Sequence, residues 1–544
     1  MKINRFSGSL FFALLIVLGF SQILIFAQGD QSELAEYIRQ NYTKREVMIP
    51  MRDGVKLFTS IYEPNDRSQK YPILMSRTPY SVSPYGADKY KTSLGPNVLF
   101  AKEGYIFVYQ DVRGRLMSEG EFVNVRPDID NRKKTDIDES TDTYDTIDWL
   151  IKNVDNNNGR VGTYGISYPG FYTSAGSIDS HPALKACSPQ APVSDWYNGD
   201  DMHHNGAFFL AQNFRFFASF GQERPGPVDN YSYMKQLNYG TPDGYKFYKE
   251  MGGLGRSDDV YRENFGADVK FWNEMQAHPN YDQFWKDRNI LPKLKNIKCA
   301  TMTVGGWYDN EDLYGALGTY RHIEKQNPGI YNVLVMGPWF HGGWERAEGD
   351  WLGTAYFGEK TSLNYQKNIE LPFFEHFLKD KGDISNIKEV NLFDTGANTW
   401  KNFDTYDPTN TIQTSLFFTA NGGLTFSESA LEAKRGSDEY ISDPMHPVPY
   451  TQKITLNYPR DFMTEDQRFA SERPDVLVYT SEPLTKDITV AGDIKPQLLV
   501  SSTGMESDVD VKLIDVFPDD HRYPESVKHP ENSPFSVFKP GGLQ

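Results

Sequence analysis

The stretch Arg160-Val161-Gly162-Thr163-Tyr164-Gly165-Ile166-Ser167-Tyr168-Pro169-Gly170 places a serine between glycines, where a strand pattern gives way to a helix pattern. Residues 160–164 read as a short buried strand, and residues 171–176 are compact enough to begin a packed helix. Such a turn strains the backbone at Ser167 and exposes its hydroxyl as a nucleophile, and the glycines leave space that a Cβ would fill. The second glycine follows Ser167 by three residues instead of the usual two, so a glycine-rich loop without chemistry is the alternative interpretation.

Two later strand patterns each end in a candidate catalytic side chain. Cys299–Val304 leads into an acid-rich loop that contains Asp309 and Asp312, and Tyr331–Met336 leads into a loop that contains His341. Open α/β sheets collect ligands and catalysts at the carboxyl ends of their strands. Serine, then acid, then histidine is the chain order of α/β-hydrolases. Spacing alone does not separate Asp309 from Asp312 as the acid.

The first 385 residues alternate strand patterns with helix patterns. This order predicts an α/β fold with a mostly parallel sheet that is covered on both faces. A turn signal at Arg52-Asp53-Gly54 predicts a hairpin from the two strands that flank it. The predicted strands are 46–51, 55–62, 72–77 and 105–110, and the predicted helices are 98–101 and 142–153.

Two further regions follow a different pattern. Residues 201–290 are rich in aromatic residues and helix formers without convincing strands, which predicts a helical cap inserted over the site, or a plain structural insertion. Past residue 386, short strands and turns without helices indicate an all-β domain. Its predicted strands are 416–419, 476–479, 488–490, 496–501 and 510–516.

Length, composition and the first residues limit the choice of function class. The 544 residues exceed what one core usually holds, so two or three domains are expected. The formal net charge of −17 disfavours nucleic acid and anionic membrane as partners. Residues 1–29 have two basic residues, an apolar run and a small-residue stretch, which predicts a signal peptide and an exported protein; an uncleaved anchor is the alternative. The two cysteines, Cys187 and Cys299, are expected to be buried thiols.

Taken together, these motifs resemble the family that includes cocaine esterase, α-amino acid ester hydrolases, glutaryl acylases and X-Pro dipeptidyl peptidases. The family's form of the serine turn is Gly-x-Ser-Tyr-x-Gly, which matches residues 165–170, and the likeness runs from about residue 45 to the end. It implies an α/β-hydrolase core at 30–200 and 291–385, a helical cap at 201–290 and a carboxy-terminal jelly roll at 386–544. The ending at Gly541-Gly542-Leu543-Gln544 is abrupt for that jelly roll, so we expect this domain to be incomplete.

The closest likeness within the family is to the α-amino acid ester hydrolases, and it implies a set of site residues. The implied catalytic triad is Ser167, Asp309 and His341. The implied oxyanion hole combines the backbone N–H of Tyr168 with the hydroxyl of Tyr80. A carboxylate cluster for the substrate's α-ammonium group is implied at Asp201, Glu311 and Asp312. Without the resemblance, spacing does not separate Asp200 from Asp201, and these acids could equally cap helices or face water.

These residues predict a serine hydrolase that cleaves esters or amides of α-amino acids through an acyl-enzyme, with acyl transfer to amines as a further outcome. No cofactor or metal is required. The expected partner is a small amino ester, amide or peptide, without nucleic acid and without stable membrane association after signal cleavage. The resemblance implies a homotetramer. The alternatives are an X-Pro dipeptidyl peptidase, a general carboxylesterase of the cocaine esterase type and a carbohydrate-binding protein with an inactive α/β part.

Overall fold

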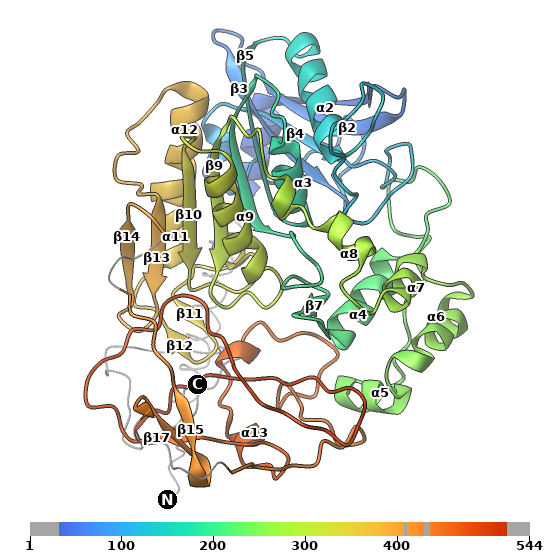
Figure 1. The fold of residues 1–544 in the computed structure, drawn as a ribbon. Coiled ribbons are helices and arrows are strands. Elements are labelled where there is room, and N and C mark those ends of the chain that lie inside the picture. The colour runs from blue at the N-terminus through green and yellow to red at the C-terminus, as the bar shows by residue number, and fades with distance from the viewer. Residues whose placement is uncertain (1–31, 407–410, 429–435, 519–544) are drawn as a thin grey trace, which may run out of the picture.

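A ten-stranded mixed sheet forms the centre of the computed structural model, which describes residues 32–406, 411–428 and 436–518 (Figure 1). The strand order is β1-β2-β4-β3-β5-β6-β9-β10-β13-β14. The seven strands from β4 to β13 are parallel, and antiparallel strands complete both edges. The strands are β1 (Tyr42–Pro50), β2 (Lys56–Pro64), β3 (Tyr71–Thr78), β4 (Ile106–Asp111), β5 (Asn157–Ser167), β6 (Leu184–Pro192), β9 (Ala300–Gly306), β10 (Asn332–Gly337), β13 (Val390–Asp394) and β14 (Thr399–Phe403).

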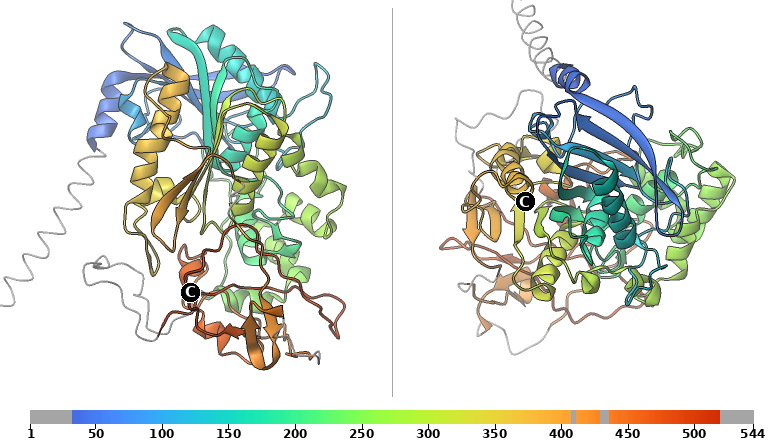
Figure 2. Two further views of the ribbon diagram at one scale, coloured as in Figure 1. Left: turned by 60° about the vertical axis from the view of Figure 1, so that its left-hand side comes forward. Right: turned by 90° about the horizontal axis from the view of Figure 1, so that it is seen from above.

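Helices cover both faces of this sheet, which confirms the predicted α/β fold (Figure 2). In β3, Ile73 and Met75 belong to one hydrophobic core and Leu74, between them, to the other, because successive strand residues point to opposite faces. The first core contains side chains of α2 (Glu139–Asn153) and α3 (Tyr168–Ser177). The second contains side chains of α12 (Leu371–Lys379). Helix α9 (Leu313–Gln326) packs on β6 and β9.

The predicted elements of the amino-terminal half are present, with shifted ends. The hairpin of β1 and β2 pairs Pro50 with Lys56 across the predicted turn. The helix predicted at 142–153 begins at Glu139, because the side chain of Asp138 accepts a hydrogen bond from Thr141 N and caps it. The helix predicted at 98–101 is one turn of 3₁₀-helix, Phe100–Lys102.

Most of the regular structure in the segment inserted between β6 and β9 is helical. It contains α4 (Leu210–Phe220), α5 (Gly244–Met251), α6 (Ser257–Phe265), α7 (Lys270–Ala277) and α8 (Gln283–Arg288), together with the two-residue strands β7 (His203–His204) and β8 (Ala207–Phe208). These helices lie together beside the lower end of the sheet in Figure 1. Phe220 of α4 packs against Tyr168 at a ring-centroid distance of 5.7 Å, so the segment contacts the serine turn.

The carboxy-terminal region forms fewer strands than its sequence predicts. The domain boundary expected at residue 386 stays a prediction; β13, which follows it, pairs with β10, and β14 pairs with β13, so both strands extend the main sheet. The strands predicted at 488–490, 496–501 and 510–516 do not form; only an isolated bridge residue occurs, at Val516. Most of their apolar side chains are exposed, with Leu499 at 101%, because in the described part of the chain no strand pairs with them and no sheet covers them.

Beyond β14, the strands of the described residues form a small three-stranded sheet. It consists of β15 (Phe417–Thr419), β16 (Gly423–Thr425) and β17 (Thr480–Ser481), and it lies below β11 (Trp351–Leu352) and β12 (Ala355–Tyr356) in Figure 1. Strand β15 agrees with the prediction at 416–419, whereas β17 begins one residue after the predicted strand 476–479. The hydrogen bond from Thr354 Oγ1 to Thr464 O, at 2.9 Å, ties the region to the core.

Other expectations concern the leader and the thiols. The predicted signal peptide, residues 1–29, lies outside the described residues. Across the described ranges, no helix combines the length and apolar character that crossing a bilayer demands. Cys187 and Cys299 are both buried free thiols, as expected, with their Sγ atoms 3.5 Å apart.

Candidate active site

Ser167 lies at the junction of β5 and α3 in a strained conformation. Its φ of 67° and ψ of −127° place a non-glycine residue where side chains are rarely tolerated. A Cβ on Gly165 would come within 2.5 Å of the backbone of Pro169, and one on Gly170 within 2.6 Å of Gln190 O. Both glycines therefore permit the close approach that the turn requires. Ser167 itself is half-buried and lies at the carboxyl end of the strand.

The residues predicted to form the oxyanion hole are Tyr168, which follows Ser167 in the chain, and Tyr80, whose ring lies near that of Tyr168. Tyr168 opens α3, so its backbone N–H has no partner within the helix. Its hydroxyl is occupied elsewhere and accepts a hydrogen bond from Val125 N at 2.8 Å. The Tyr80 ring lies 6.4 Å from the Tyr168 ring. Burial, and then the charge of Asp201, raise the pKa of Tyr80 well above its ordinary value, so its hydroxyl stays protonated and able to donate.

Asp309 and His341 are in direct contact across two loops. Asp309 Oδ2 lies 2.9 Å and Oδ1 3.1 Å from His341 Nδ1. The loops are joined by backbone hydrogen bonds, such as Tyr308 N to Trp339 O at 3.0 Å. Gly306, at the end of β9, permits this, because a Cβ there would stand 2.1 Å from Trp339 O. Adjacent parallel strands β9 and β10 thus deliver the acid and the imidazole to one place.

The charges of this pair stabilise each other. Burial opposes ionisation of Asp309, but the charge and hydrogen bond of His341 hold its pKa below the ordinary value. The N–H groups of Glu311 and Asp312 also donate to Asp309 Oδ1, at 2.9 and 3.0 Å. Burial likewise opposes a charged His341, but Asp309 and Glu311 outweigh it and raise the pKa of His341 to about 10. The carboxylates around it thus favour the charged form of the imidazole in the substrate-free protein.

The three carboxylates predicted to bind an ammonium group all lie around His341. Glu311 Oε2 is 3.5 Å from His341 Nε2, and Asp312 Oδ2 is 3.9 Å from Nδ1. Burial, and then the charge of Glu311, raise the pKa of Asp201 to about 7. Burial and repulsion from Asp201 raise the pKa of Asp312 well above its ordinary value. The carboxyls of this cluster therefore take up protons more readily than free ones, unless a cation comes among them.

Asp312 is the member of this cluster with the strongest need of a partner. It is fully buried at the N-terminus of α9, and neither of its carboxylate oxygens has a hydrogen-bond partner in the described part of the chain. It therefore does not cap the helix, which removes the structural explanation offered by spacing alone. A buried carboxylate without a partner is costly unless a proton or a cation reaches it.

Asp200 and Asp201, which the sequence could not separate, have different surroundings. Asp200 Oδ2 accepts hydrogen bonds from Ser194 N at 2.7 Å, Ser194 Oγ at 2.7 Å and Asp195 N at 2.6 Å, so it closes a turn. Asp201 accepts one, from Trp196 Nε1 at 3.0 Å. Sequence reasoning missed Trp196, because nothing in the pattern distinguishes an indole that orients a carboxylate from one that fills the core.

The third member of the predicted triad, Ser167, does not touch the imidazole. Within the described ranges, no hydrogen bond joins the Ser167 hydroxyl to His341, and Glu311 lies against His341 Nε2. Catalytic hydrogen bonds are often long in substrate-free enzymes and tighten in the complex. The arrangement supplies a strained serine, an imidazole held by an acid, and an anionic cluster.

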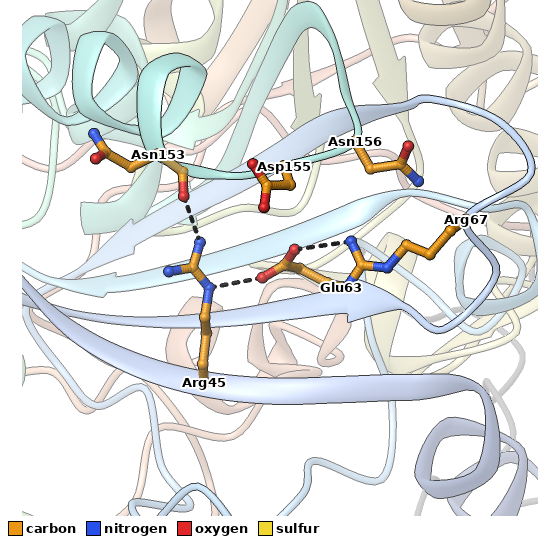
Figure 3. Close-up of a pocket in the computed structure, with 6 residues that line it drawn as sticks. All are labelled: Arg45, Glu63, Arg67, Asn153, Asp155 and Asn156. Carbon is orange, nitrogen blue, oxygen red and sulfur yellow. Dashed lines mark hydrogen bonds and ion pairs between the residues drawn. The ribbon is translucent and has the colours of Figure 1, made fainter.

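A separate depression on the surface is lined by Arg45, Glu63, Arg67, Asn153, Asp155 and Asn156 (Figure 3). It lies at the amino end of β5, whereas Ser167 lies at the carboxyl end of that strand. Glu63 pairs with both arginines, Arg45 at 2.6 Å and Arg67 at 3.5 Å. Glu63 thus has a counter-charge on two sides, and the depression lies away from the residues of the candidate site.

Comparisons with known proteins cover most of the chain. Residues 53–343 match the family model described as X-Pro dipeptidyl-peptidase (S15 family), and residues 384–538 match its C-terminal non-catalytic domain. Cocaine esterase from Rhodococcus sp. is 27% identical, over 87% of this chain and 80% of its own length.

Two solved structures are similar over most of the chain. The crystal structure of an aminopeptidase from a marine sediment Thaumarchaeota archaeon has 35% identity and a TM-score of 0.73, over 82% of this chain and 73% of its own. An α-amino acid ester hydrolase has 32% identity and a TM-score of 0.72, with the same coverage.

Proposed function

We propose that this chain, which belongs to the X-Pro dipeptidyl-peptidase (S15) family and is a serine hydrolase, acts on esters or amides of α-amino acids. The observation that carries the proposal is the cluster of Asp201, Glu311 and Asp312 around His341. A neutral acyl group would leave these carboxylates without a counter-charge. A substrate α-ammonium group would supply one next to the carbonyl that reacts.

In the proposed mechanism, the hydroxyl oxygen of Ser167 attacks the substrate carbonyl while His341 Nε2 removes its proton. Asp309 holds Nδ1–H, which fixes the tautomer and stabilises the imidazolium that forms. The backbone N–H of Tyr168 and the hydroxyl of Tyr80 donate to the oxyanion. The imidazolium then protonates the leaving alcohol or amine, and an acyl-enzyme remains. Water, activated by His341, releases the acid, and an amine in place of water would take the acyl group.

In this proposal, the substrate's ammonium group also affects the protonation of His341. The imidazole must be neutral to accept the serine proton, yet the surrounding carboxylates raise its pKa to about 10. An ammonium group among Asp201, Glu311 and Asp312 offsets their charge and lowers that pKa. It also draws Glu311 away from Nε2, the nitrogen that must face Ser167. Substrates with an α-ammonium group would thus favour the active form of the base.

Two alternatives share the triad. An X-Pro dipeptidyl peptidase would also bind a terminal ammonium group, and the family match and the similarity to an archaeal aminopeptidase favour an amine-recognising enzyme. A general esterase has support from the 27% identity to cocaine esterase. The carboxylate cluster favours the amine-recognising functions over the general esterase.

Further proposals concern the setting of the enzyme. We propose that residues 1–29 direct export, because basic residues precede an apolar run and a small-residue stretch. We also propose a homotetramer, on the likeness to the α-amino acid ester hydrolases alone. Size-exclusion chromatography with light scattering, and sequencing of the mature N-terminus, test these two proposals.

The proposed function is tested with three substrates and one probe. Phenylglycine methyl ester, an Ala-Pro anilide and phenyl acetate represent the amino ester hydrolase, the dipeptidyl peptidase and the general esterase. We expect the first to be turned over with the highest kcat/KM. A fluorophosphonate should label the protein, and Ser167→Ala should abolish both labelling and turnover. Labelling that persists in Ser167→Ala would show that Ser167 is not the nucleophile.

A further inference from the structure

The loop that carries His341 is held from inside the core by two tryptophans. It runs from the end of β10 at Gly337 to α10 (Gly343–Arg346). Trp339 Nε1 donates to Thr361 Oγ1 at 2.9 Å, and Trp344 Nε1 donates to Gln190 Oε1 at 2.7 Å. Both indoles are fully buried. Since His341 lies between them in the chain, these two hydrogen bonds help to set where the imidazole stands.

Gln190, which accepts the hydrogen bond from Trp344, also donates a hydrogen bond of its own. It is a fully buried residue of β6, and its Nε2 donates to Glu370 Oε1 at 2.7 Å. An indole N–H can only donate, so the amide oxygen of Gln190 must face Trp344. Its amide nitrogen must then face Glu370. The amide therefore connects the His341 loop to a carboxylate in one orientation.

Glu370 is fully buried and is the last residue of a π-helix, Gln366–Glu370, between α11 (Thr361–Tyr365) and α12. Its second oxygen, Oε2, accepts from Asn97 Nδ2 at 2.7 Å. The same π-helix presents Gln366, whose Nε2 donates to Trp344 O at 2.6 Å. Rare π-turns within helices are frequently found at functional sites. Here the π-helix carries Gln366, which contacts Trp344 directly, and Glu370, which is linked to Trp344 through Gln190.

Glu370 has few charged neighbours in the described part of the chain. Burial raises the pKa of Glu370 to about 7, against hydrogen bonds from Gln190, Asn97 and Tyr365. Glu345 of α10 lies near enough to be repelled by it, and Arg346 offsets part of the charge of Glu345. The proposed chemistry uses none of these groups directly.

We propose that Glu370 is a positioning residue for His341, which acts through Gln190 and Trp344 to fix the loop that carries the imidazole. The inference rests on the proposed role of His341 as the base. A base displaced by about 1 Å loses about 100-fold in rate. Because Glu370 touches neither substrate nor imidazole, its loss should lower kcat and leave KM unchanged.

The direct variant is Glu370→Gln. Both oxygens of Glu370 accept from amide nitrogens, so a glutamine there must set its own NH₂ against one of them. We expect kcat to fall about 10- to 100-fold. We also expect the acidic limb of the kcat profile to move to lower pH, since a looser contact with Asp309 lowers the pKa of His341. Glu375→Gln is the matched control: it alters a buried carboxylate of α12 that accepts from Tyr105 and does not reach the loop.

A double variant distinguishes a displaced His341 loop from a general loss of stability. Asn97→Asp added to Glu370→Gln restores an acceptor opposite the new amide, while the glutamine oxygen still accepts from Gln190. We expect the double variant to recover most of the lost kcat and the original pH limb. Trp344→Phe removes the indole N–H and keeps the carboxylate, and it should lower kcat as Glu370→Gln does.

The outcomes distinguish this inference from the proposed function. If Ser167→Ala retains activity, the proposed function fails and the inference falls with it. If activity depends on Ser167, but Glu370→Gln lowers kcat no more than Glu375→Gln, only the inference is overturned. A folded double variant that recovers neither kcat nor the pH limb overturns it as well, and so does a Trp344→Phe variant with unchanged kcat.

Discussion

Glu311 Oε2 lies 3.5 Å from His341 Nε2, the imidazole nitrogen that the proposed mechanism turns toward Ser167. Asp309 holds the opposite nitrogen at 2.9 Å, so carboxylates flank both sides of the ring. The Glu311 side chain keeps 31% of its surface exposed, and an incoming cation can therefore reach it. The substrate-free site thus favours the charged form of its base.

Glu311→Gln should make the enzyme a better esterase toward neutral substrates at neutral pH. Removing this charge lowers the pKa of His341 from about 10 by about one unit, so more of the imidazole is neutral. The acidic limb of kcat/KM for phenyl acetate should move to lower pH by the same amount. A pH series with wild type and variant measures it.

Glu348→Gln is the control for that series. Glu348 follows His341 in the chain and pairs with Lys360 at 2.6 Å on the surface. Its loss should leave the pH limb in place. If the acidic limb of the kcat/KM profile does not move in Glu311→Gln, Glu311 does not set the charge of His341.

Tyr80→Phe tests the oxyanion hole. The variant keeps the ring that packs against Tyr168 and Phe220 but removes the hydroxyl donor. Loss of one such donor typically costs about 100- to 1,000-fold in kcat. Steady-state kinetics on phenylglycine methyl ester measure the loss, and Tyr90→Phe, in the same segment of the chain, should be close to wild type. Equal kcat values for the two variants would assign the oxyanion to other donors.

Asp200 is expected to be structural, in contrast to Asp201. Asp200→Ala removes an acceptor of three hydrogen bonds and should lower the free energy of unfolding by about 1–3 kcal/mol. Asp200→Asn should be milder, because its amide oxygen can still accept. Denaturant titration measures both, and a fully stable Asp200→Ala would contradict this role.

The stability contributed by Asp200 should depend on pH. Burial raises its pKa to about 8, against hydrogen bonds from Ser194 and Asp195, so between pH 3.8 and about 8 the folded state binds a proton that the unfolded state has lost. The free energy of unfolding should therefore fall as the pH rises through this window. Asp200→Asn cannot titrate and should show a smaller fall in the same series.

The core of the fold and the serine turn could be predicted because they depend on local patterns. Glycines at 165 and 170 and apolar strands that end in Asp309 and His341 are visible in the sequence, and the structure places them at adjacent strand ends. The individual strands of the carboxy-terminal region could not all be predicted in this way. A segment such as 496–501 has strand propensity, but a strand forms only where a neighbour pairs with it and buries its side chains.

The individual contacts within the site could not be predicted from sequence patterns, for a different reason. That Asp200 closes a turn while Asp201 meets Trp196 depends on backbone geometry that two adjacent aspartates do not reveal. The link from Trp344 through Gln190 to Glu370 joins residues up to 180 positions apart. No periodicity signals it, because each residue alone fits a buried polar position.

The most direct measurement of the central claim, recognition of an α-ammonium group by the carboxylate cluster, compares two esters that differ only in the amine. These are phenylglycine methyl ester and methyl phenylacetate, each assayed with wild type and Asp201→Asn. We expect wild-type kcat/KM to favour the amino ester by about 30-fold or more, and Asp201→Asn to remove most of that preference without slowing methyl phenylacetate. Equal kcat/KM values for the two esters in wild type, or equal losses on both in Asp201→Asn, would contradict the account.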